Sequence, residues 1–238
     1  MAVIRPFKAL RPKPEVAQLV ASVPYDVVNV AEAREYAQNF PDSFLRITRS
    51  EIELPDSVGH YDDQVYLRAK SNLERIINDA PLITDESPHF YIYRLVMDGR
   101  AQTGITATFS VDDYDNNVIL KHEKTRKEKE DDRTKHIITT RAQTGVVFLT
   151  YKDVEAVNTI IQNVTASVKP VYDFTAPDGI SHTIWIVPAE LNNTIVEHFA
   201  NVKNLYIADG HHRAKSASRA REEMQKSNPN HSRSEERR

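Results

Sequence analysis

The residues best suited to chemistry lie in the run Asp209–Arg213, which reads D-G-H-H-R. It follows the apolar stretch Leu205–Ala208 and precedes a helix-like stretch, so we expect a strand, a tight turn and a helix N-terminus. A glycine in such a turn lets the backbone approach a ligand, and the first N–H groups of a helix favour anions. An arginine adds paired donors for phosphate oxygens, and Asp209 could hold Mg²⁺ or accept a proton. The run therefore favours a phosphate site made of Gly210, His211, His212 and Arg213.

Two other interpretations of this run stay open. It could be a structural turn with a capped helix and surface histidines. It could also be a His–His zinc site, which we disfavour because adjacent histidines point apart on most backbones and no H-x-x-x-H spacing accompanies them.

A second candidate is the charged run that begins at Lys121, with the sequence K-H-E-K-T-R. A carboxylate between cations at the end of a strand could act as a general base, which makes Glu123 a catalytic candidate beside Asp209. Nearby cations could hold a substrate's carboxylate or neutralise transferred charge, so the substrate-binding candidates here are Lys121, His122 and Arg126. The alternative is an exposed helix with salt bridges, because Lys121–Lys135 holds seven basic and five acidic residues.

Two further substrate-binding candidates lie nearer the N-terminus. Asp26 follows Pro24-Tyr25 in a loop, where an aspartate could bind a ligand but also commonly caps a turn. Arg46 lies in Ser43–Leu54, a partly alternating segment that predicts a strand, and could reach an anion or simply face solvent.

Composition excludes several classes of protein. The 238-residue chain has no cysteine, which removes disulfides, thiolate metal sites and cysteine nucleophiles, and fits a cytoplasmic location. No apolar run is long enough to span a bilayer. From Arg213 onward there are eight basic and four acidic residues, whereas the first 212 residues hold 23 basic and 30 acidic ones. Extended nucleic-acid binding is therefore disfavoured, although a small phosphate site is not.

The elements that would position these residues include helices and hairpins. Helices are predicted over Ala31–Asn39, from Asp62 to before Pro81, after Val154 and over Glu190–Val202. A hairpin is predicted from Phe90–Met97 to Gly104–Val111 around Asp98-Gly99, and a second around Pro177-Asp178-Gly179. Further strands are expected at Val118–Leu120 and Val146–Tyr151. The mixture predicts an α/β (α+β) fold with a mixed, largely antiparallel sheet and flanking helices, divided into regions 1–120 and 121–238.

One pentapeptide occurs twice. The sequence R-A-Q-T-G at Arg100–Gly104 recurs at Arg141–Gly145, each time before an expected strand. The flanking residues do not match, so we interpret the two copies as similar loops leading into strands and not as a duplication.

The motifs together resemble a bacterial family catalogued as domain of unknown function 1015. The resemblance covers essentially the whole chain and rests on MAVIRPFKALRPKPE, ASVPYDVVN, SFLRITR, FYIYR, GITA, TGVVFLTY, YDFTAPDGISHTIW and YIADGHHRAKSA. Family members are longer, so the resemblance implies that this chain is the N-terminal portion of a longer protein.

The D-G-H-H-R motif in turn resembles the nucleotide-phosphate motif of the ParB and sulfiredoxin superfamily, which includes a free-serine kinase and CTP-binding partition proteins. This implies that Gly210–Arg213 hold nucleotide phosphates and that Asp209 lies at the reacting centre, as part of a ParB/sulfiredoxin-like strand–loop–helix. Sulfiredoxin chemistry needs a cysteine in this loop, and the chain has none. Family members are also associated with serine biosynthesis.

These observations lead to one main hypothesis: a nucleotide-dependent phosphotransferase that uses ATP or ADP with Mg²⁺ and acts on a small hydroxyl compound such as free serine, or on phosphoserine in reverse. In this hypothesis Glu123 is the preferred general base. Asp209 is the metal ligand and the second candidate for the base. The alternatives are a nucleotide-binding regulator without catalysis and a scaffold protein. The enzyme hypothesis requires Glu123 and Asp209 to converge on the turn at Gly210.

Overall fold

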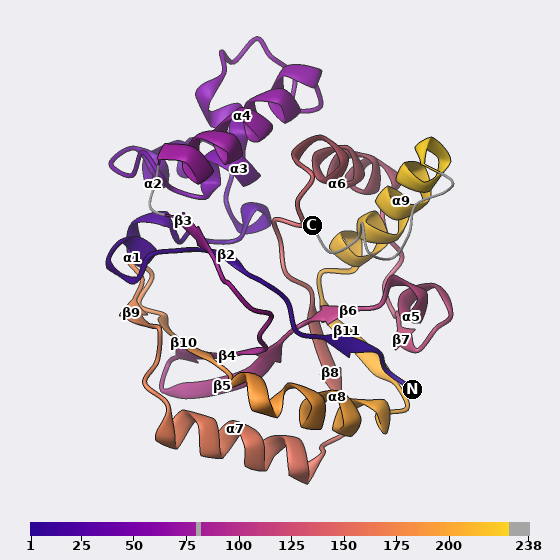
Figure 1. Cartoon of the computed structure of the whole chain (residues 1–238). Helices are drawn as coiled ribbons and strands as arrows, with labels where there is room; N and C mark the ends of the chain where they lie inside the picture. The colour runs from indigo at the N-terminus through magenta and orange to yellow at the C-terminus, as the bar shows by residue number, and fades with distance from the viewer. Residues whose placement is uncertain (80–81, 229–238) are drawn as a thin grey trace.

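The computed structural model describes residues 1–79 and 82–228 and has the mixed α/β fold that the sequence predicts (Figure 1). The helices are α1 (Ala17–Val20), α2 (Val30–Ala37), α3 (Leu45–Thr48), α4 (Asp63–Asp79), α5 (Val111–Asp115), α6 (Lys127–Thr140), α7 (Glu155–Ser167), α8 (Asn192–Ala200) and α9 (His211–Ser227). The strands are β1 (Ile4–Arg5), β2 (Leu10–Pro12), β3 (Leu82–Thr84), β4 (Tyr91–Met97), β5 (Arg100–Thr106), β6 (Thr108–Phe109), β7 (Ile119–Leu120), β8 (Phe148–Tyr151), β9 (Tyr172–Thr175), β10 (Ser181–Ile186) and β11 (Leu205–Asp209). Short 3₁₀ turns include η2 (Tyr25–Val27) and η3 (Ser50–Glu53). In this part of the chain no helix combines the length and apolar character needed to cross a membrane.

The largest sheet is antiparallel, with the strand order β5-β4-β10-β9. Both predicted hairpins are confirmed within it. Asp98 and Gly99 have φ angles of 51° and 76°, which is the left-handed pair that a two-residue hairpin turn requires. The second strand of this hairpin begins at once at Arg100, so the first R-A-Q-T-G copy lies inside β5, whereas the second is a loop. The interpretation of both copies as loops leading into strands is therefore wrong for the first copy and confirmed for the second.

A smaller sheet has the order β7-β11-β8 and sets the geometry of the candidate site. The central strand β11 is parallel to β7 and antiparallel to β8. The carboxyl ends of β7 and β11 and the start of β8 therefore lie at one edge of this sheet. The segments at that edge are the loop after β7, the turn after β11 and the loop before β8.

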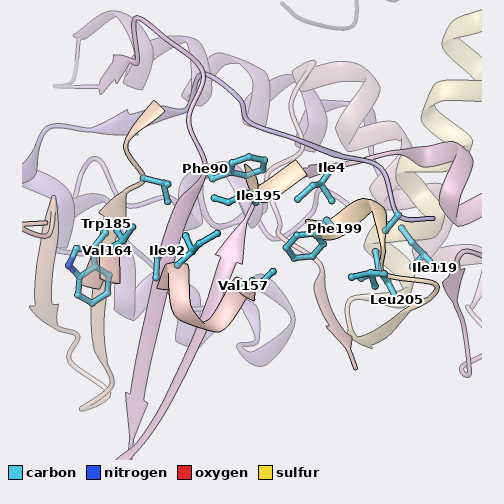
Figure 2. Close-up of a cluster of buried hydrophobic side chains, with 14 of the residues drawn as sticks. Ile4, Phe90, Ile92, Ile119, Val157, Val164, Trp185, Ile195, Phe199 and Leu205 are labelled. Carbon is cyan, nitrogen blue, oxygen red and sulfur yellow. The ribbon is translucent and has the colours of Figure 1, made fainter. Parts of the chain in front are cut away.

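The main core lies between the sheets and the helices α7 and α8 (Figure 2). It includes Phe90 and Ile92 beside β4, Val157 from α7, Phe199 from α8 and Leu205 from β11. Burying each of these side chains stabilises the fold by roughly 1.5–3 kcal/mol. The core and the pairing of β4 with β10 draw on both 1–120 and 121–238, so the expected division at residue 120 passes through one sheet and one core.

Helix α4 follows its predicted period, with Val65, Ala69, Leu73 and Ile76 buried. Figure 1 shows α2, α3 and α4 gathered at one end of the molecule, with α6 and α9 beside each other. Pro81, before which the helix from Asp62 was expected to end, and residues 229–238 lie outside the described residues.

The expected strand over Ser43–Leu54 is wrong, since this segment forms α3 and η3. Its apolar residues alternate because the segment lies between two helices and is buried on both sides. Leu45 packs in a cluster with residues of α2, and Ile47 packs with residues of α4. Arg46 supports this arrangement by donating to the carbonyls of Ala37 and Phe40, at the end of α2.

Truncating Phe199 tests the assignment of the main core between the sheets and the helices α7 and α8. Phe199 is 2% exposed and its ring meets that of Tyr151, with 5.1 Å between centroids. We expect Phe199→Ala to lower the free energy of unfolding by about 3–5 kcal/mol in urea denaturation, because it leaves a cavity. The control is Phe148→Ala, where 43% of the side chain is exposed and the expected loss is at most about 1 kcal/mol. Equal losses would contradict the assigned core.

Candidate functional site

The site begins with the turn from β11 into α9, which depends on Gly210. This residue has a φ of 91°, in the left-handed region that side chains rarely adopt. A Cβ atom here would also lie 3.4 Å from the Cα of Val147 and from Nη1 of Arg213. The glycine thus lets the chain turn sharply and start α9 at the sheet edge, as the sequence predicts.

The loop after β7 packs directly on this turn. The Nδ1 atom of His211 lies 3.3 Å from a carboxylate oxygen of Glu123. The rings of His122 and His211 meet almost at right angles, with 4.4 Å between centroids. The backbone N–H of Arg126 donates to Nε2 of His212 at 3.1 Å. The two charged motifs therefore form one site, although their contacting residues are more than 80 positions apart in the sequence.

Arg213 joins three segments by binding oxygens of the protein itself. Its guanidinium donates to Asp26 at 2.9 Å, to Asp209 at 3.1 Å and to the carbonyl of Val146 at 2.7 Å. The side chain is 12% exposed, and a Cβ atom on Gly145 would lie 3.1 Å from its Cδ. Burial lowers the pKa of Arg213, but the hydrogen bond and charge of Asp26 outweigh this effect and raise it. Arg213 thus connects η2, the loop before β8 and the end of β11.

This arrangement changes the interpretation of two predicted residues. The sequence predicts that Arg213 presents a free pair of donors to phosphate and that Asp26 binds a substrate. In the structure the two side chains bind each other. Any phosphate contact of Arg213 requires donors beyond those that already bind Asp26, Asp209 and Val146.

A cavity of about 410 Å³ opens beside His211, on the side of Glu123. Its lining residues are Tyr114, Lys121, Glu123, Lys124, Thr125, His211 and Lys215. We call it the lysine pocket. Nζ of Lys121 donates to the carbonyl of Tyr114 at 2.7 Å and lies 4.0 Å from the centroid of its ring. Burial lowers the pKa of Lys121; Asp115 opposes this shift and the positive charge of Lys215 adds to it.

His211 is buried in the wall of the lysine pocket. Its side chain is 4% exposed. Burial lowers its pKa and the charge of His122 lowers it further, while Glu123 opposes the shift. The imidazole is therefore neutral at pH 7. Its Nε2 atom is buried and has no hydrogen-bond partner among the residues that the structure describes.

Sequence reasoning missed Lys215, Tyr114 and Gly145. Lys215 lies four residues after His211, a spacing that places both on one face of a helix and could have identified it. Tyr114 and Gly145 carry no such local signal, because Tyr114 lies in α5 and Gly145 in the loop before β8, and only the folded chain brings them to the site.

Arg46 does not join the site. Its guanidinium binds Glu53 at 2.6 Å and the two carbonyls at the end of α2, which ties it to the packing of α2 and η3. The expectation that it holds a substrate anion is therefore corrected, because those protein oxygens already use its donors.

The described residues include no group of three or more His, Asp or Glu side chains placed to hold a metal ion. Nε2 of His212 already accepts a hydrogen bond from the backbone of Arg126, so it would have to give up this bond to ligate zinc. Magnesium bound through phosphate oxygens and water needs only one or two protein carboxylates. The exposed carboxylates that fit this role are Asp209, 65% exposed, and Glu123, 54% exposed.

Replacing the turn glycine tests its conformational role. We expect Gly210→Ala to lower the free energy of unfolding by about 1–2 kcal/mol, because alanine is strained at this φ angle. Thermal and urea denaturation measure the change. The matched control is Gly59→Ala, where a Cβ atom would meet nothing within 4 Å and φ is not positive. A Gly210→Ala protein as stable as this control would refute the turn geometry.

Comparison with known proteins gives the chain a family. A family model described as "Protein of unknown function (DUF1015)" matches residues 4–238. No curated protein and no solved structure shows significant similarity to the chain. The likeness of the D-G-H-H-R turn to the ParB and sulfiredoxin motif stays a prediction. Since the match spans nearly all of its residues, the chain belongs to the DUF1015 family.

Proposed function

We propose that this protein is a nucleotide-dependent phosphotransferase that acts on a small hydroxyl compound, such as free serine, or catalyses the reverse transfer from phosphoserine. One observation carries the proposal: Glu123, Lys121 and Lys124 from the loop after β7 line one pocket with His211 and Lys215 of the first turns of α9, beside a glycine turn. A helix N-terminus and cations favour phosphate, and a carboxylate beside them can take a proton.

Catalysis of phosphoryl transfer is mainly positioning and electrostatic stabilisation. The N–H groups at the start of α9 would hold nucleotide phosphates, supported by Lys121 from the facing loop. His122 and Arg126 lie in the same loop, where they would contact the rest of the substrate. Such an enzyme would act in the cytoplasm, where ATP and ADP are found.

Glu123 is the proposed general base. It would take the proton of the acceptor hydroxyl while the hydroxyl oxygen forms a bond to the γ-phosphorus of ATP. The bond between that phosphorus and the bridging oxygen breaks, and ADP leaves with the electron pair. His211 lies beside the Glu123 carboxylate and, being neutral, would position it without competing for the phosphate as a cation.

Magnesium would neutralise the charge on the phosphates. Asp209 is the residue proposed to hold it, since its carboxylate lies at the end of β11 and is largely exposed. Asp209 is also the second candidate for the base. Arg213 would keep this carboxylate in place through its 3.1 Å contact.

A ³¹P NMR time course tests the proposal directly. One sample holds the protein, Mg²⁺, serine and ATP or ADP, and a second holds phosphoserine with ADP or AMP. We expect the phosphoserine signal to grow or decay, and Glu123→Gln to slow the change by about 100-fold or more, as for loss of a general base. Asp209→Asn should weaken the dependence on Mg²⁺ concentration.

The matched control is Glu197→Gln, an exposed glutamate of α8 that lies outside the site. It should turn over like the wild type. Broadened nucleotide signals without transfer would favour the non-catalytic nucleotide-binding regulator instead. An unchanged spectrum would favour the scaffold.

A further inference from the structure

The lysine pocket brings together cations from separate parts of the chain. Lys121 and Lys124 belong to the loop after β7, and Lys215 lies on the first turns of α9. Tyr114, from α5, forms another part of the wall and fixes Lys121 through its carbonyl and its ring. The cluster is therefore assembled by the fold and is not a single charged helix face.

The charges in this pocket are unbalanced. Three lysines face one glutamate, and His211 is neutral at pH 7. Lys215 lies close enough to Lys121 for its positive charge to lower the pKa of Lys121. Asp115 lies close enough to Lys121 to favour its charge, and with both carboxylates counted the surroundings of the pocket still carry a net positive charge that attracts an anion.

Two of the lysines have free donors. Neither Lys124 nor Lys215 forms a hydrogen bond or an ion pair with any residue in ranges 1–79 and 82–228. Placing like charges together without carboxylate partners destabilises the folded protein, and an anion in the pocket would relieve this repulsion.

His211 forms a buried part of the pocket wall. His211 lines the pocket and is more than nine-tenths buried, yet its Nε2 atom lacks a partner among the described residues. A buried nitrogen without a hydrogen bond costs roughly 1–3 kcal/mol. Because Nδ1 of the neutral ring faces the Glu123 carboxylate and carries the proton, Nε2 can only accept a hydrogen bond, so its partner would be a water molecule or an ammonium group and not a phosphate oxygen.

We infer that the lysine pocket binds a phosphate dianion through Lys124 and Lys215, and that the ligand is a small phosphomonoester or the terminal phosphate of a nucleotide. The inference deepens the proposed function, because it places the phosphoryl group next to Glu123. The lysine pocket, with a volume of about 410 Å³, leaves room for more than an inorganic ion.

Calorimetric titration with inorganic phosphate at low salt tests the site without requiring turnover. We expect wild-type protein to bind phosphate, and Lys124→Gln and Lys215→Gln each to weaken binding about tenfold, as for loss of a charged hydrogen bond. The control is Lys152→Gln, which removes the same charge from an exposed lysine after β8, at the opposite edge of the three-stranded sheet. Circular dichroism melting confirms that each variant is folded.

Wild-type protein that binds no phosphate, or folded Lys124 and Lys215 variants that bind it as tightly as the Lys152 control, would overturn the inference. Titrations with phosphoserine and with ATP then separate the two sources of phosphate. A loss of affinity for phosphoserine assigns the pocket to the acceptor, and a loss for ATP assigns it to the nucleotide. Lysine variants that keep their affinity for both phosphoserine and ATP would overturn the site.

The two proposals fail separately. Phosphate binding that needs both lysines, in a protein that transfers no phosphoryl group, would sink the phosphotransferase and keep the pocket. Turnover that is unchanged in both lysine variants, in a protein that binds no phosphate in the pocket, would keep the phosphotransferase and overturn the pocket.

Discussion

The candidate site depends on the buried guanidinium of Arg213. It binds one oxygen each from η2, from the loop before β8 and from the end of β11, and thereby fixes the direction in which α9 leaves the sheet. Asp26 and Asp209 are 36% and 65% exposed, so solvent weakens both ion pairs, and the coupling of the three segments rests on the shared guanidinium more than on the strength of any one pair. Gly145 and Gly210 leave the space that this side chain occupies. The positions of His211 and Lys215 follow from the same helix direction.

The first turns of α9 therefore serve two purposes on two faces. Arg213 lies about 200° around the helix from His211 and faces the interior contacts, whereas His211 and Lys215 share the face that lines the lysine pocket. The interior face stabilises the turn. The open face carries unpaired cations next to Glu123, which is unfavourable for stability and favourable for an anion. Such a conflict is what a binding site imposes on a fold.

Local signals predicted much of this architecture. Helix α4 has a long apolar period, and the hairpin turns hold residues that tolerate positive φ angles, so both could be predicted from short windows. Ser43–Leu54 could not, because its alternation arises from burial between α2 and α4 and imitates a strand. The convergence of Glu123 on the turn at Gly210 is a hypothesis from the sequence, and the strand order brings the two segments together through the contact of Glu123 with His211. The contact of Asp26 with Arg213 joins residues 187 positions apart, and no local pattern contains it.

The central claim is that the loop after β7 and the turn after β11 form one phosphate site. The most direct measurement is a crystal structure of the protein with Mg²⁺ and a non-hydrolysable ATP analogue. We expect phosphates at the start of α9, with a phosphate oxygen within hydrogen-bond distance of Lys124 or Lys215 and the carboxylate of Glu123 facing the same group. Nucleotide bound elsewhere, with the lysine pocket empty, would contradict it.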